Sequence, residues 1–341
     1  MVAGVYGNSM KKVNVVFCMD TEGPCDDPNN VELLYNWNLV DKAMDKLFTV
    51  DFRTKYPDSY GGHFKIGWFF LQWTGFKTNP RGRDFGHHKV RDHYLERYGN
   101  LLKKYGDEEC WHYHHPPTSG VGNEWGMEWN SSTEYNEIIS RQIIERGWFP
   151  TCFRAGGTIM NSDLSQWLER WFPFDYSNRA PLSFKEMDWS NGVVDWYPYH
   201  PDPKYFKSEG NGRRYMSRCM DLKTNLYTSD KKDIEQAFLE ASLKGKSILS
   251  VFDHDYRDIE ERILSFLSKL NLVSKKYDEI SWQYSTPSDA IIDVTNDDSN
   301  NNLLKLKLTV SENKLNIKVE GDVYQEYPWV VFRGKNGSIT Q

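Results

Sequence analysis

The chain has 341 residues, which is room for one large domain of about 250–300 residues with an appendage, or for two ordinary domains. Its net charge is −6, and a nucleic-acid partner is not expected because neutralising phosphates requires a basic face. Aromatic residues make up 15% of the chain, which is typical of core packing and also suits stacking on sugar rings.

Cysteine usage and hydropathy bear on the compartment. The five cysteines are an odd number without Cys-x-x-Cys spacing, and three lie in predicted strands, where a free thiol packs as a small apolar side chain. We therefore expect no disulfide framework and a reducing compartment. We base no fold prediction on residues 1–9. Because the amino end has no apolar run of signal-peptide length and no stretch reaches about 18 apolar residues, we expect a cytoplasmic protein without a membrane span.

The first predicted strand ends in two carboxylates. Six of the seven residues 13–19 are apolar and three are valine, which is typical of a buried strand. Asp20 and Glu22 follow, just before Gly23-Pro24. If the strand continued, both side chains would point to one face. Burying two carboxylates there is costly unless a cation lies between them.

Predicted strands and helices then alternate along the chain. Further strands are expected at 64–71, 110–114, 149–154, 192–197, 247–252 and 279–284. Helices are expected at 31–47, 88–105, 131–147, 232–243 and 258–270, from about 162 and from 287, with 172–228 otherwise irregular. Alternation of this kind, with polar residues after strand ends, predicts an α/β sheet or barrel whose site lies at the carboxyl ends of the strands.

We expect the carboxyl-terminal part to form a separate unit. Residues 295–302 are polar and predict a linker between a domain at 10–294 and a small β appendage at 303–341. In the appendage, residues 304–308 and 315–319 alternate strictly between apolar and polar, which predicts a β-hairpin with one wet face.

A histidine cluster supplies the strongest metal signal. His112, His114 and His115 lie within four positions, and the first two would project to the same side of a strand, a common way to present two imidazoles to one Zn²⁺. His87 and His88 form a second cluster at a helix start, which we expect to be structural.

Two further strand ends carry polar residues suited to catalysis. Arg154 stands at a strand end before Ala-Gly-Gly and could orient a carboxylate through bidentate contact. His254 stands between Asp253 and Asp255 after a largely apolar strand, and a histidine beside carboxylates can act as a general acid.

The order of these pieces resembles the polysaccharide deacetylase family with the NodB-type catalytic domain, over roughly residues 13–294. It is most similar to the divergent branch found in bacterial surface-polysaccharide biosynthesis clusters. The resemblance implies an irregular (β/α)7-type barrel with a divalent metal, for which we expect Zn²⁺. It also implies a carbohydrate substrate, a precursor or intermediate of a surface polysaccharide, from which an N-acetyl or other acyl group is removed.

Carried over residue by residue, the resemblance gives each site residue a role. Asp20 would be the base, Glu22 the metal carboxylate, His112 and His114 the metal imidazoles, Arg154 the residue orienting Asp20, and His254 the acid. Substrate contacts are expected from Trp111 and from Tyr199 and His200, which belong to a stretch resembling the family's aromatic-proline loop.

The chain departs from the family pattern at three places. Thr21 separates the two carboxylates, the histidines are two rather than four apart, and Gly156 stands where the family has Pro. Which of Asp20 and Glu22, and which of the three histidines, bind metal is therefore open. Two alternative functions stay open as well: a catalytically degenerate carbohydrate-binding barrel, and a metal amidase acting on a small non-sugar amide.

Overall fold

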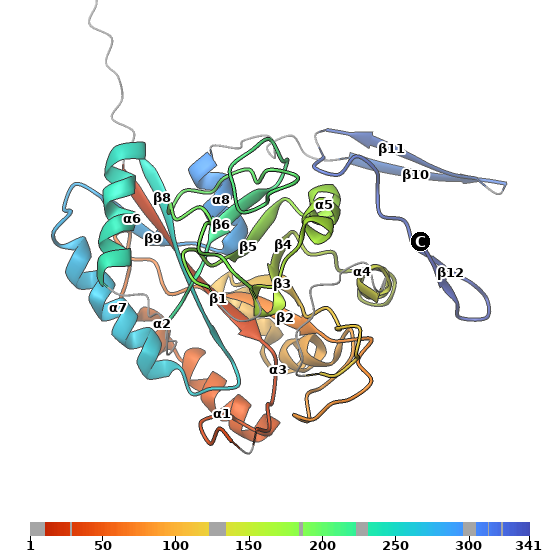
Figure 1. The fold of residues 1–341 in the computed structure, drawn as a ribbon, viewed down its shortest axis with the longest axis horizontal. Coiled ribbons are helices and arrows are strands. Elements are labelled where there is room, and N and C mark those ends of the chain that lie inside the picture. Colours follow the sequence, from red (N-terminus) through yellow and green to blue (C-terminus); the bar gives the residue numbers. More distant parts are fainter. Residues whose placement is uncertain are drawn as a thin grey trace, which may run out of the picture.

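A computed structural model describes residues 11–27, 29–122, 134–183, 187–222, 231–295, 305–312, 314–321 and 323–341. Its centre is a nine-stranded sheet in which the neighbouring strands run parallel (Figure 1). The strands are β1 (Lys12–Thr21), β2 (Gly67–Gln72), β3 (Glu108–Tyr113), β4 (Cys152–Ala155), β5 (Phe174–Asn178), β6 (Tyr215–Arg218), β7 (Met220–Asp221), β8 (Lys246–His254) and β9 (Ser281–Tyr284).

The sheet winds into a nearly closed barrel. Its order is β6-β5-β4-β3-β2-β1-β8-β7, with β9 paired to the first half of β1. β6 pairs with β5 while β7 pairs with β8, and only Cys219 separates these two short strands. The segment from β6 to β7 therefore links the two edges of the sheet. The predicted α/β barrel class is confirmed.

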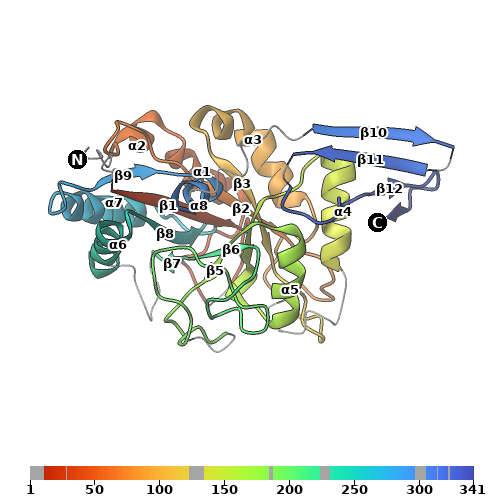
Figure 2. The ribbon, with the colours of Figure 1, turned by 90° about the horizontal axis from the view of Figure 1, so that it is seen from above.

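Helices surround this sheet (Figures 1 and 2). They are α1 (Trp37–Leu47), α2 (Val50–Thr54), α3 (Lys89–Tyr105), α4 (Glu134–Arg146), α5 (Ser162–Trp171), α6 (Lys231–Lys244), α7 (Glu260–Ser274) and α8 (Pro287–Thr295), with a short 3-10 turn η2 at Gly156–Thr158. None of the helices described is both long and apolar enough to cross a membrane.

Local chemistry decides where the first helix begins. The apolar spacing predicted a helix from residue 31, but α1 starts at Trp37 because the Asn36 side chain accepts a hydrogen bond from the Leu39 N–H and caps the helix. Residues 31–35 precede it as loop. The first three residues of the helix expected at 131–147 lie outside the described residues.

Helix α8 packs at the amino end of the barrel. Its Asp293 accepts hydrogen bonds from Lys12 and Asn14 at the start of β1 and from Lys246 at the start of β8. Its apolar residues join the core cluster that fills the barrel interior. Four cysteines belong to that cluster: Cys18, Cys110, Cys152 and Cys219. All five cysteines are free thiols, as expected.

Two segments differ from the sequence expectation. Residues 192–197, expected as a strand, are irregular. Their carbonyls reach the sheet singly: Val193 accepts from the Asn178 side chain, Val194 from the Arg218 side chain and Trp196 from the Ile248 N–H. The region 172–228, expected to be irregular, contributes β5, β6 and β7. These strands were missed because they are short and carry polar residues, whose burial depends on partners elsewhere in the fold.

The carboxyl-terminal hairpin forms as predicted, from β10 (Lys305–Ser311) and β11 (Lys314–Glu320). A second small pair, β12 (Phe332–Arg333) and β13 (Ile339–Thr340), follows it. Every residue of β10 is exposed, so its apolar face is not packed against the barrel. Both views show this hairpin at the periphery of the molecule (Figures 1 and 2).

A buried ion pair joins α2 to the sheet. Arg53 and Asp107 are both fully buried and form two parallel hydrogen bonds of 2.8 Å. Arg53 also donates to the carbonyls of Leu47 and Phe64, while the Asp107 carboxylate accepts from the Trp68 indole. Since the polar atoms on both sides are satisfied, removing one partner leaves an uncompensated buried charge.

We predict that Arg53→Met lowers the free energy of unfolding by about 3–5 kcal/mol, because Asp107 loses its buried partner. The control is Arg97→Gln, which breaks the exposed pair with Asp45 and should cost only about 0–1 kcal/mol. Urea unfolding of both variants measures the difference. Equal losses of unfolding free energy in the two variants would contradict a larger contribution from the buried pair than from the exposed one.

Candidate metal centre and active site

The candidate site is the uppermost layer of the barrel interior. Alternate residues of a strand point to the same side. Hence on four strands an interior residue is followed, two positions later, by a site residue at or just beyond the carboxyl end of the strand. On β1 the series runs Cys18, Asp20, Glu22; on β3 it runs Cys110, His112, His114; on β4 Cys152, Arg154; and on β8 Phe252, His254.

Glu22, His112 and His114 form a buried group able to hold a metal ion. Oε1 of Glu22 lies 3.5 Å from Nε2 of His112 and 3.3 Å from Nε2 of His114, and the two nitrogens are 3.2 Å apart. Around a tetrahedral zinc with bonds of about 2.0–2.1 Å, ligand atoms lie roughly 3.3–3.4 Å apart. The donor set and its spacing therefore fit a divalent metal with three protein ligands and an open position.

Glu22 is held in place from both sides. Its second oxygen, Oε2, lies 2.8 Å from Nη1 of Arg83, which leaves Oε1 facing the imidazoles. Its backbone N–H and that of Gly23 donate to the buried Asp255 carboxylate, which also accepts from the Tyr94 hydroxyl. Asp255 thus fixes the turn that follows β1.

The two imidazoles are oriented by different means. Nδ1 of His112 lies 2.9 Å from the Arg154 carbonyl, which can only accept, so this nitrogen carries the proton and Nε2 keeps its lone pair for a metal. The His114 ring stacks on Trp73 at 4.8 Å between centroids. A Cβ at Gly156 would overlap the His114 ring, so only glycine leaves space for it.

Electrostatics hold Glu22 and His114 in the protonation states that metal binding requires. Burial by itself raises the pKa of Glu22, but Arg83 and the two facing imidazoles hold that pKa well below its usual range. Burial lowers the pKa of His114 to about 4 against the opposing attraction of Glu22. At neutral pH the group therefore offers a carboxylate and a neutral imidazole, which are the forms that bind metals.

Asp20 lies beside this group in a buried ion pair with Arg154. Nε of Arg154 is 2.8 Å and 3.0 Å from the two Asp20 oxygens, and its Nη1 donates to the Tyr176 carbonyl. The guanidinium also lies over the Phe252 ring, 3.6 Å from its centroid. These contacts fix the direction of the Asp20 carboxylate.

His254 faces both carboxylates of β1. Its Nε2 is 3.8 Å from Oδ2 of Asp20 and 3.7 Å from Oε1 of Glu22. On the other side of the ring, Nδ1 lies 3.1 Å from Nη1 of Arg257. The contact with Arg257 orients the ring so that Nε2 faces Asp20 and Glu22.

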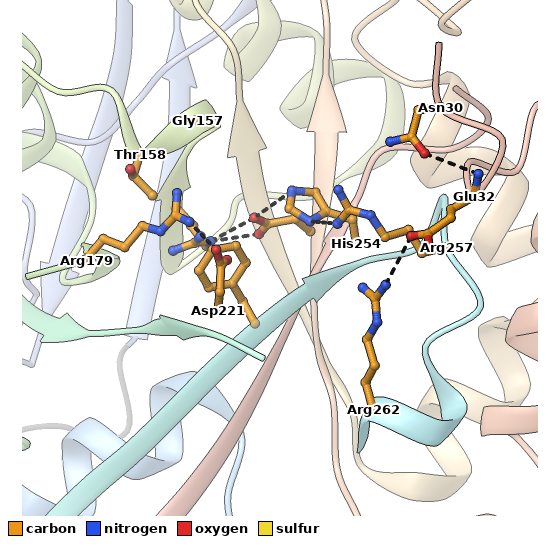
Figure 3. A pocket seen from close by; sticks show the side chains of 12 residues that line it. Asn30, Glu32, Gly157, Thr158, Arg179, Asp221, His254, Arg257 and Arg262 are labelled. Atoms are coloured by element: carbon orange, nitrogen blue, oxygen red, sulfur yellow. Dashed lines mark hydrogen bonds and ion pairs between the residues drawn. The ribbon is translucent and has the colours of Figure 1, made fainter. Parts of the chain in front are cut away.

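A cavity of about 390 Å³ opens beside Asp20 and His254 (Figure 3). Its lining is mostly polar or charged: Asp20, Asn30, Glu32, Arg154, Gly157, Thr158, Arg179, Asp221, Phe252, His254, Arg257 and Arg262. Thr158 is buried with a left-handed φ of 56°, and its hydroxyl finds no hydrogen-bond partner among the residues that the structure describes. The cavity therefore suits a hydroxyl-rich ligand more than an apolar one.

The structure does not bring the expected substrate contacts into this cavity. The indole of Trp111 is fully buried between Tyr113 and Phe153, on the face of β3 opposite His112. The Tyr199 hydroxyl donates to the buried Phe206 carbonyl, and the His200 ring is tilted against that of Tyr215. Neither residue belongs to the cavity lining.

The other expected histidines, His115, His87 and His88, lie outside the group able to hold a metal. His115 is buried beside Tyr113, outside the group able to hold a metal. His87 and His88 lie next to each other at the start of α3, and Nε2 of His87 is 2.9 Å from Glu145. The group thus consists of His112 and His114, with Glu22 rather than Asp20 as its carboxylate.

Several residues of the site were missed from the sequence. Arg83 comes from a loop rich in Gly, Pro and Arg, and nothing in the order of residues tells that it folds back onto Glu22. Arg257 and Arg262 follow the Asp-His-Asp motif, and their positions three and eight residues after His254 would have been the available signal.

Comparisons with known proteins give little beyond this geometry. No family model matches the chain, and no curated protein matches it. Among solved structures, the chain is similar to a proposed glycoside hydrolase/deacetylase from Parabacteroides distasonis, with 13% identity over 88% of this chain and 75% of that one and a TM-score of 0.45. A similarity of this size carries no argument about function, so the proposals below rest on the chain itself.

We predict that Gly156→Ala lowers zinc affinity at least about tenfold, since ligand orientation is worth that much at metal sites. The added methyl group must displace the His114 ring. The control is Gly99→Ala in α3, where a Cβ meets only ordinary contact and the helix should gain about 1 kcal/mol. Competition with a chromogenic zinc chelator measures both. Unchanged affinity in Gly156→Ala would contradict the assignment of His114 as a ligand.

Proposed function

We propose that the protein is a metal-dependent hydrolase that removes an acyl group from the nitrogen of an amino sugar, with zinc as its metal. The observation that carries this proposal is the spacing of Glu22, His112 and His114, with Asp20 and His254 adjoining the same point. A group that only stabilised the barrel would have no need of a separate pair of proton-transfer residues beside it.

A divalent metal, when bound, supplies a Lewis acid that acidifies a water and polarises the amide carbonyl. Asp20 then acts as the base that accepts the proton of the attacking water. Arg154 keeps the Asp20 carboxylate in one orientation, which limits the reorganisation needed at the moment of proton transfer. Arg154 is thus a positioning residue that acts through Asp20.

His254 completes the reaction as the acid. Its Nε2 is directed toward the space next to Asp20, where the leaving nitrogen would lie. As the imidazolium, His254 gives its Nε2 proton to the nitrogen as the carbon–nitrogen bond breaks, which releases a free amine, and the acyl group leaves as a carboxylic acid. Asp20 then returns to the neutral imidazole the proton that it took from the water. Proton transfer by a positioned side chain contributes typically about 10²–10⁴ in rate.

The sugar part of the proposal is supported by the cavity and by the sequence resemblance. A cavity lined mainly by charged and polar side chains can hydrogen-bond the hydroxyl groups of a saccharide. The family branch that the sequence resembles is found in bacterial surface-polysaccharide biosynthesis clusters, so acylated amino-sugar precursors of such polymers are the first substrates to test.

Asp20→Asn should keep its zinc and lose at least about 100-fold in turnover, because the amide cannot accept the proton. Glu22→Gln should instead lose the metal, which separates the two carboxylates by role. His87→Gln, from the histidine pair outside the site, is the control and should keep both metal and activity. Zinc is measured by elemental analysis and turnover by amine release from a panel of N-acetyl amino sugars. Wild-type turnover in Asp20→Asn would contradict the base assignment.

Zinc should also stabilise the fold through this group. A ligand that binds only the native state adds about 2.7 kcal/mol at a free concentration of 100 Kd. Thermal unfolding of the wild type with and without added zinc should show a higher midpoint with zinc, and Glu22→Gln should show almost none of that shift. An equal shift in the two proteins would place the zinc elsewhere.

A further inference from the structure

Four arginines line the cavity, and two of them are neutralised one to one. Arg154 pairs with Asp20, and Arg179 pairs with Asp221 on one side of the cavity (Figure 3). Each of these pairs contributes no net charge. The pairing of charges differs on the opposite side of the cavity, where His254, Arg257 and Arg262 lie.

Arg257 and Arg262 share a single buried carboxylate. Nη1 of Arg257 lies 3.2 Å from one oxygen of Asp253, and Nη1 of Arg262 lies 3.2 Å from the other. The second acid near Arg262 is Glu32, at 3.8 Å, but its side chain is 72% exposed, so water and salt screen the interaction. Within the described lining, this side of the cavity therefore sets two guanidiniums against one buried carboxylate and one carboxylate open to solvent.

The two guanidiniums are also held in fixed positions. Asp253 is buried and anchors both of them, and Arg257 is held further by the His254 ring and by the face of Tyr256. A guanidinium has five N–H donors, so donors remain on each arginine for an oxyanion. Pre-placed guanidiniums of this kind bind carboxylate and phosphate groups by directed, charge-assisted hydrogen bonds.

Arg257 and Arg262 lie next to the proposed reaction point. Arg257 contacts Nδ1 of His254, while the opposite nitrogen of that ring faces Asp20 and Glu22. A ligand with its acylamino group at the metal centre would therefore extend past His254 toward the two arginines. Any acidic substituent on that ligand would meet them.

We propose that the cavity selects an amino sugar bearing an oxyanion, a carboxylate or a phosphate, which Arg257 and Arg262 bind. The identity of the acylamino end rests on the function proposed above. The oxyanion preference depends only on the charge of the cavity, so it can be measured by binding to metal-free protein, without turnover.

Calorimetry on the full chain, freed of metal, tests the preference with three probes: N-acetylglucosamine, N-acetylmuramic acid and N-acetylglucosamine 1-phosphate. The two acidic probes should bind at least about tenfold more tightly than the neutral one, and the difference should shrink as sodium chloride is raised. Tighter binding of the carboxylate or of the phosphate probe identifies which oxyanion the cavity prefers.

Arg262→Gln should reduce the preference for the acidic probes at least about fivefold, and Arg257→Gln should do the same. Arg97→Gln, which removes a carboxylate-paired guanidinium from α3, is the matched control and should leave the preference unchanged. Circular dichroism checks the fold of each variant. If Arg257→Gln fails to fold, Arg262→Gln still decides, because Asp253 keeps Arg257 as a partner.

Equal binding of neutral and acidic probes by the wild type would overturn this proposal. An unchanged preference in folded Arg262→Gln would do so too. Neither result touches the hydrolase proposal, which fails instead if zinc-loaded protein releases no amine from any N-acetyl amino sugar. The two failures are therefore distinguishable.

Discussion

The burial of two carboxylates at the end of β1 is the constraint on which the site depends. Asp20 and Glu22 are almost completely buried, and a buried charge destabilises a fold unless it is paired and hydrogen-bonded. The chain meets this requirement with two arginines from distant segments, Arg154 for Asp20 and Arg83 for Glu22. His112 and His114, at the end of β3, face Oε1 of Glu22, the oxygen that Arg83 does not contact.

This pairing has a consequence for the charge of the whole centre. With each carboxylate matched by a guanidinium and His114 neutral, the group carries little net charge before a dication binds. A dication held there would keep most of its own charge, because the ligand carboxylate is already shared with Arg83. Together with the arginines around Asp253, such a centre favours ligands with negative charge.

Much of the site could be predicted from the sequence because parallel strands simplify the geometry. Their carboxyl ends meet at one edge, so polar residues at 20–22, 112–114, 154 and 254 had to converge if the strands were correctly placed. The alternation of side chains also explains why Trp111 lies away from the cavity. It is adjacent to His112 on a strand, so its side chain points to the opposite face and into the core.

The rest could not be read from local patterns. Arg83 reaches Glu22 from a loop, and the strands β5 to β7 consist of short, partly polar segments that become strands only through their neighbours. The hairpin β10–β11 was predicted because its alternation is strict, but its apolar face proved exposed rather than packed. Local periodicity predicts a strand well, while the partner of each face is a tertiary property.

X-ray absorption spectroscopy of the zinc-loaded protein tests the central claim most directly. The account predicts imidazole scattering from two histidines with nitrogen and oxygen ligands at about 2.0–2.1 Å, and loss of this pattern in Glu22→Gln. Four buried cysteines lie in the interior just below the site and are the obvious rival ligands. Sulfur scattering at about 2.3 Å, or zinc without imidazole neighbours, would contradict the account.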